Sequence, residues 1–96
     1  MRQLQWSPEA RSDMSGIDAY YRQLNPDFSR RVLAEAVAAG RTLLRHPHAG
    51  PVIDIDGLRK WRVARTPYIL FYRATETELR ILRVIHAAQD WQKEFE

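Results

Sequence analysis

The residues best suited to chemistry are basic side chains gathered between Arg59 and Arg83. This stretch holds two acids, Glu76 and Glu78, and seven basic residues: Arg59, Lys60, Arg62, Arg65, Arg73, Arg80 and Arg83. The chain before it carries seven basic and seven acidic residues and is therefore neutral. The formal net charge of +3 at pH 7 thus originates in this stretch. A charge of this size permits an anionic partner without requiring one.

Four of these cations lie on or beside one expected strand. Alternate side chains of a strand point to opposite faces, so Arg59, Trp61 and Arg65 are expected on one face. Lys60 and Arg62 are expected on the other. One interpretation is a basic groove for an acidic protein segment or for phosphates, which the forked guanidinium group suits well. The other is a solvated sheet edge whose charges discourage edge-to-edge pairing. The pattern favours neither, and Trp61 fits core packing as well as partner contact.

Two residues of the last expected strand also stand out. Arg83 interrupts an apolar face between Ile81 and Ile85, where an unpaired charge would be costly to bury. We expect it on the uncovered face of the sheet, reaching solvent or a partner. His86 ends the strand, and an imidazole can act as a general acid or base near neutral pH. For His86 we favour a structural or partner-contact role over catalysis.

Signatures of metal and cofactor chemistry are missing from the sequence. There are no cysteines, which excludes disulfides, thiolate metal sites and cysteine nucleophiles. His46 and His48 flank Pro47 without further ligands at metal-binding spacing, so we interpret them as loop residues. No phosphate-binding loop, dinucleotide fingerprint or zincin motif is present. We expect no cofactor and no metal.

Length and hydropathy limit the number of domains and the possible locations of the protein. Ninety-six residues suit one domain, 1–96, with a modest core. No apolar run approaches the roughly 20 residues that a membrane span needs. The first residues lack the apolar segment of a secretory signal. We therefore expect a cytoplasmic protein with no membrane association.

The first half of the chain predicts a strand followed by two helices. Residues 2–6 alternate in polarity, as a short strand does. Ser7 is a good N-cap and Pro8 fits the first helical position, so a helix is expected from Pro8 to about Leu24. Asn25 and Pro26 repeat this pattern of an N-cap followed by proline, and they predict a second helix that ends before the proline-rich segment 46–51. Helices joined this tightly form a hairpin.

The second half predicts three strands, over residues 58–64, 68–73 and 79–86. The middle one is apolar on both faces and is therefore expected to be central. Residues 52–57 are expected to cross over, extended at first and turning at Asp56-Gly57, and residues 87–96 form a short terminal helix or an ordered tail. The order β-α-α-β-β-β predicts an α+β fold. A small antiparallel sheet would contain an N-terminal strand and a C-terminal three-stranded meander, with the helical hairpin packed on one face.

Five motifs carry a family resemblance. In order along the chain they are WSPEARSDMSGIDAYY, LLRHPHAGP, GLRKWRV, YILFYR and ILRVIHAAQDW. Together they resemble the ParE/RelE superfamily of bacterial toxins over essentially the whole chain. The sequence is more similar to ParE, the plasmid-stabilisation branch, than to the RelE branch.

The resemblance implies the toxin half of a type II toxin–antitoxin system, bound by a small ParD/RelB-like antitoxin in a hetero-oligomer. ParE-like members are associated with inhibiting DNA gyrase. We expect such a toxin, acting by binding and without catalytic residues. Antitoxin or target would contact Arg59, Lys60, Trp61, Arg62, Arg65 and Arg83, with Arg59 of the GLR motif the strongest single candidate.

Two alternatives stay open. RelE-like members cut mRNA on the ribosome, and an endoribonuclease of that kind would use His86 with Arg83, Arg62 and Arg59. However, Ala87-Ala88-Gln89-Asp90 follows His86 where basic residues often stand in the superfamily, and no tyrosine follows. The second alternative is a non-toxic interaction module of the same fold.

Overall fold

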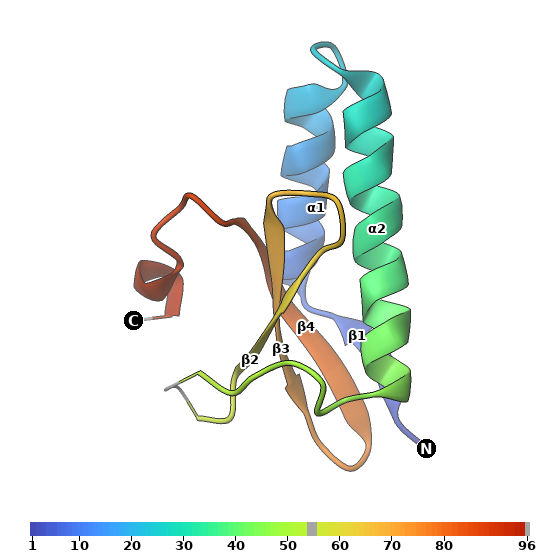
Figure 1. The fold of residues 1–96 in the computed structure, drawn as a ribbon, viewed down its shortest axis with the longest axis vertical. Helices are drawn as coiled ribbons and strands as arrows, with labels where there is room; N and C mark the ends of the chain where they lie inside the picture. The colour runs from blue at the N-terminus through green and yellow to red at the C-terminus, as the bar shows by residue number, and fades with distance from the viewer. Residues whose placement is uncertain (54–55, 96) are drawn as a thin grey trace.

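The computed structural model describes residues 1–53 and 56–95. Its fold is α+β, as predicted, with a helical hairpin on one face of a four-stranded sheet in the order β1-β4-β3-β2 (Figure 1). The elements are β1 (Gln3–Trp6), α1 (Pro8–Tyr21), α2 (Pro26–Arg45), β2 (Arg59–Arg62), β3 (Tyr68–Ala74), β4 (Glu78–His86) and the 3₁₀ helix η1 (Trp91–Phe95). Neither α1 nor α2 contains the long apolar stretch that a membrane crossing needs.

The sheet is mixed rather than wholly antiparallel. The meander β2-β3-β4 has the predicted antiparallel pairing. β1 lies on the far side of β4 and runs parallel to it, with Gln3 opposite Glu78 and Trp6 opposite Ile81. The helical hairpin follows β1 and returns to the same side of the sheet, and the connection after α2 then leads to β2 at the opposite edge (Figure 1).

Both helices begin at the residues that the capping pattern predicted. The Ser7 hydroxyl accepts a hydrogen bond from the Ala10 N–H at 2.9 Å, and it also donates to the Leu82 carbonyl at 2.8 Å. The first turn of α1 is thereby fastened to β4. The Asn25 side chain caps α2 by accepting from the Phe28 N–H at 3.1 Å. α1 ends at Tyr21, before the predicted Leu24, which is 68% exposed.

The sheet is covered on both faces. On the helix face the core contains Val32, Leu43, Leu70, Tyr72 and Leu79 among others. On the opposite face a smaller cluster surrounds the fully buried Phe71. The rings of Trp91 and Phe95, both in η1, lie 5.1 and 5.2 Å from the Phe71 ring. η1 therefore covers part of the second face (Figure 1).

A β-bulge in β4 corrects one predicted face. Tyr72 pairs with Ile81 and Phe71 pairs with Arg83, so Leu82 is an extra residue without a partner on β3. Such an insertion reverses the alternation beyond it. Ile81 lies in the helix-side core, whereas Ile85 packs in the opposite cluster with Phe71. The prediction that Ile81 and Ile85 share a face was wrong for this reason.

The segment before β2 follows its prediction where it is described. Val52 forms an isolated antiparallel bridge with Arg59, so extended chain lies beside the start of β2. Asp56 and Gly57 have φ angles of 41° and 74°, the left-handed conformation of the predicted turn. Residues 54 and 55 of the predicted crossing segment lie outside the described residues.

Candidate functional site

The basic edge, defined here as Arg59, Lys60, Trp61, Arg62 and Arg65, lies on and just after β2 at the border of the sheet. Within the sheet β2 is bonded to β3 alone. On its outer side the Lys60 N–H donates to the Pro51 carbonyl at 3.2 Å. Backbone groups alternate in direction along a strand, so the N–H and C=O of Arg62 also point outward. β2 is therefore an edge strand, and only its first half is paired on the outer side, with the loop that precedes it.

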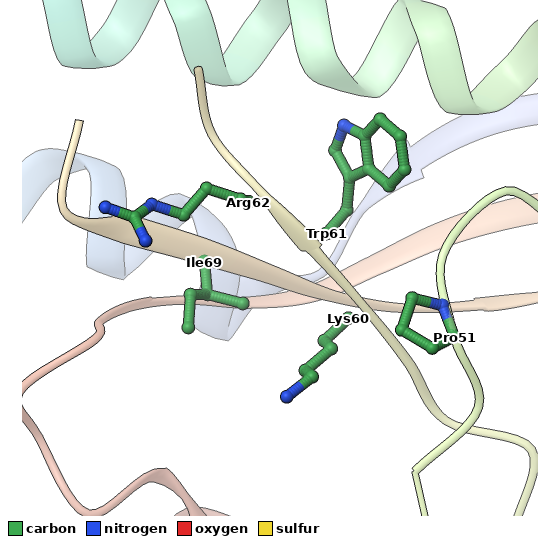
Figure 2. Close-up of a pocket in the computed structure, with 5 residues that line it drawn as sticks. All are labelled: Pro51, Lys60, Trp61, Arg62 and Ile69. Atoms are coloured by element: carbon green, nitrogen blue, oxygen red, sulfur yellow. The ribbon is translucent and has the colours of Figure 1, made fainter. Parts of the chain in front are cut away.

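The side chains of β2 alternate as predicted. Trp61 packs against the helix-side core, while Lys60 points to the other face of the sheet (Figure 2). The Lys60 ammonium lies 5.9 Å from the centre of the Trp91 ring, a cation–π distance. Arg65 follows the strand in a left-handed turn with φ of 61°, so it does not share the strand's alternation.

Two hollows flank β2, one on each face of the sheet. The first, of about 270 Å³, is lined by Pro51, Lys60, Trp61, Arg62 and Ile69 (Figure 2). Its floor is apolar and its rim is basic. The second, of about 210 Å³, lies between α2 and β2 and is lined by Glu35, Ala38, Ala39, Thr42, Trp61 and Ala64. An added strand places alternate side chains on opposite faces, so hollows on both sides of one edge match that geometry.

Arg59 is turned toward its own chain. Its Nη1 donates to the Gly50 carbonyl at 2.7 Å and to the His48 carbonyl at 3.3 Å. Tyr72, opposite Arg59 on β3, donates its hydroxyl to the Pro47 carbonyl and accepts from the Gly50 N–H, both at 3.0 Å. Burial raises the pKa of Tyr72, which keeps that donor protonated. Arg59 and Tyr72 together hold the loop that follows α2.

Arg62 and Arg65 are each held by one side-chain contact, against two for Arg59. The Arg62 Nε donates to the Thr66 carbonyl at 3.0 Å, which ties the guanidinium to the next turn. Arg65 forms an ion pair with Glu35 at 3.0 Å, although its side chain is 78% exposed. The Glu35 side chain is only 21% exposed, so solvent screens this pair from the Arg65 side alone. The exposed guanidinium of Arg65 could meet a partner's carboxylate beside Glu35.

Arg83 occupies a different environment from the one predicted. Its Nε and Nη2 bind the two Asp13 oxygens at 2.7 and 3.0 Å, and its Nη1 binds Glu94 at 3.2 Å. The Asp13 hydrogen bond is the main cause that raises the pKa of Arg83. Only 22% of the side chain is exposed. Arg83 thus links α1 to η1 around the edge of β4, instead of lying in solvent on an uncovered face.

His86 lies at the end of β4, beside a hollow next to α1. Its Nδ1 accepts from the Ala88 N–H at 3.0 Å, and its ring meets the Tyr68 ring edge-on at 5.2 Å. On β3, His86 pairs with Tyr68 and Arg59 pairs with Tyr72. Four residues of a strand span about 13 Å, so His86 and Arg59 are separated by that length along the sheet. Arg59 and His86 therefore lie too far apart along the sheet to hold one phosphate together, and Arg83 is occupied by Asp13 and Glu94.

His46 and His48 follow α2 in the connecting loop, as predicted. Across residues 1–53 and 56–95, no three histidine, cysteine, aspartate or glutamate side chains are grouped closely enough to hold a metal ion. The described site is an edge strand that carries basic side chains and has a hollow on each face.

A family model described as the ParE toxin of the type II toxin–antitoxin system parDE matches residues 4–91. The chain belongs to the ParE toxin family. This confirms the expectation of a type II toxin of the ParE branch, and the match extends from β1 to the first residue of η1. No curated protein sequence matches the toxin significantly.

Solved structures agree with this assignment. The chromosomal ParDE system of Pseudomonas aeruginosa matches with a TM-score of 0.78 and 25% identity, over 90% of this toxin and 96% of that chain. A YoeB/ParE toxin from Agrobacterium tumefaciens matches with a TM-score of 0.63 and 17% identity, over 90% and 98%. The Escherichia coli DinJ–YafQ complex matches with a TM-score of 0.62 and 18% identity, over 92% and 96%. The last two show the shared fold.

Sequence reasoning missed the partners of the toxin's arginines. Asp13 and Glu94 neutralise Arg83 although they are 70 and 11 residues away along the chain. Asp13, Arg83 and Glu94 lie in three different elements, so no local period could reveal the pairs. The loop carbonyls that hold Arg59 carry no sequence signal at all, because every residue has a carbonyl.

Proposed function

We propose that this ParE toxin inhibits DNA gyrase by binding, without catalytic residues of its own. Membership of the ParE family supports the target. The observation that carries the mechanism is that Arg83, an arginine that a nuclease would need, is already paired with Asp13 and Glu94. A charge already paired in this way is a poor ligand for a phosphate, because binding would have to break existing hydrogen bonds.

The test is DNA supercoiling by purified gyrase with increasing toxin. Loss of supercoiling or accumulation of cleaved DNA is expected. Unchanged gyrase activity, together with codon-linked cuts in translated mRNA by primer extension, would instead support a ribosome-dependent endoribonuclease. Normal growth during overexpression without either effect would support a non-toxic interaction module.

We further propose that a small ParD-like antitoxin neutralises the toxin at the basic edge. An extended acidic segment would lie along the outer side of β2, with alternate side chains in the two hollows. Lys60, Arg62 and Arg65 would meet its carboxylates, and Trp61 would contribute apolar surface. Arg59 would act mainly by shaping the loop beside β2, and Arg83 by holding the far edge of the sheet.

Charge reversal tests this arrangement. Lys60→Glu and Arg62→Glu place negative charge at the rim of the first hollow, while Arg11→Glu makes the same change in charge on α1. Complex formation with the co-expressed antitoxin, measured by calorimetry, is expected to suffer only from the first two changes. Equal effects of all three would show that net charge, and not the basic edge, drives the association.

A further inference from the structure

A hollow lined by aromatic rings lies between α1 and the ends of β3 and β4, away from Lys60 and Arg62. Its volume is about 370 Å³, and its lining includes Tyr20, Tyr21, Tyr68 and His86. Tyr20 and Tyr21 meet edge-on with ring centres 4.8 Å apart, and Tyr20 is 65% exposed. Aromatic rings from α1, β3 and β4 therefore share the lining of one open space.

Gly16, in the middle of α1, helps to form this hollow. A glycine inside a helix costs about 1 kcal/mol relative to alanine, so its presence calls for a reason. Gly40 has one, since an added Cβ would lie 3.2 Å from the Trp6 ring. At Gly16 an added Cβ would meet nothing within 4 Å. The packing of the toxin itself does not require this glycine, and its missing side chain allows an external group to approach α1 closely.

The charges around the hollow favour a cation. Asp13 lines the hollow and is already paired with Arg83, but Glu94 pairs with the same guanidinium, so this group of two carboxylates and one guanidinium keeps one net negative charge. Neither lysine nor arginine lines the hollow among the residues described. A phosphate would find no positive partner there. The faces of aromatic rings attract cations, most strongly where water is partly excluded. Phenol rings beside a carboxylate therefore suit an ammonium or guanidinium group.

We propose that this hollow receives a lysine or arginine side chain of a protein partner. The side chain would lie over the Tyr20 ring and extend past Gly16 toward Tyr68. The hollow would bind a cation, whereas the basic edge would bind carboxylates, and the two surfaces lie on different elements. An experiment can therefore refute the proposal for one surface without affecting the proposal for the other.

The test uses a minimal cationic probe and its neutral isostere. The peptide acetyl-Gly-Arg-Gly-amide is titrated into isotopically labelled toxin and followed by the backbone amide signals in NMR. The same peptide with citrulline in place of arginine is the control, because it keeps the shape and loses the charge. Signals of Gly16, Ile17, Val84 and Gln89 are expected to shift with the arginine peptide and to shift much less with citrulline. Equal shifts, or no shifts at these residues, would overturn the proposal.

Two variants locate the contact. Tyr20→Leu keeps apolar surface but removes the ring, and should weaken arginine binding about fivefold. Gly16→Leu fills the hollow and should abolish binding, and Gly16→Ala, which places a methyl group where the side chain approaches α1, should weaken it. The NMR spectrum of each variant reports its fold. Unchanged affinity in both Tyr20→Leu and Gly16→Leu would place the probe elsewhere and refute the proposal.

Discussion

Replacing Asp13 by alanine is expected to destabilise the toxin substantially, because this carboxylate joins α1 to β4. It accepts two hydrogen bonds from Arg83 and a third, at 2.9 Å, from the Val84 N–H. The two side chains are only 16% and 22% exposed. Removing one partner of a buried pair costs about 3–5 kcal/mol, and partial exposure reduces this. Alanine also favours the helix by several tenths of a kcal/mol. The expected net loss is about 2 kcal/mol in the free energy of unfolding.

A double-mutant cycle separates the pair from its surroundings. Asp13→Ala, Arg83→Gln and the double variant are compared by urea denaturation, and a coupling energy of about 1–2 kcal/mol is expected. The exposed pair of Asp27 and Arg30, with side chains 86% and 72% exposed, is the matched control. Its coupling should be about 0.3 kcal/mol. Similar coupling in the two pairs would refute the view that Arg83 is a structural link.

Three further predictions follow from particular contacts. Gly50→Ala should lower the free energy of unfolding by about 2 kcal/mol in urea denaturation, because the new Cβ would lie 2.4 Å from the Lys60 carbonyl oxygen; unchanged stability would show that the loop yields. The Lys60→Glu/Arg62→Glu double variant should weaken the antitoxin complex about tenfold at low salt and less at high salt, with Arg11→Glu as the control in calorimetry. Burial, with the neighbouring Tyr21 hydroxyl, raises the pKa of Tyr68 to about 12. The stabilising contribution of Tyr68 should therefore be complete below pH 10 and be lost as the pH rises toward 12. Because burial also raises the pKa of Tyr72, ultraviolet titration should show a late phase that Tyr68→Phe reduces by one tyrosine and does not abolish.

Local sequence signals predicted most of the fold. Ser7 and Asn25 begin α1 and α2 because their side chains can accept from free backbone N–H groups, which is a property of a few neighbouring residues. The strands were predicted in the same local way, from the pattern of apolar residues along a few neighbouring positions. The parallel pairing of β1 was not predicted, because strand direction depends on how the chain returns across the sheet. The bulge at Leu82 likewise depends on the partner strand.

The candidate site was predicted less completely. Alternation correctly separated Trp61 from Lys60, and composition located the basic edge. Residue type alone could not distinguish an available arginine from one already bound. Arg59 is held by loop carbonyls and Arg83 by two distant carboxylates, whereas Arg65 remains largely exposed. Such long-range partners exist only once the chain has folded.

The central claim is that this ParE toxin inhibits gyrase by binding and that His86 takes no catalytic part. The most direct measurement compares the toxin with its His86→Ala variant in gyrase supercoiling and in mRNA cleavage on translating ribosomes. We predict that both proteins inhibit supercoiling to the same extent and that neither cuts mRNA. Cleavage by the toxin that disappears in His86→Ala, with gyrase unaffected by both, would contradict the account.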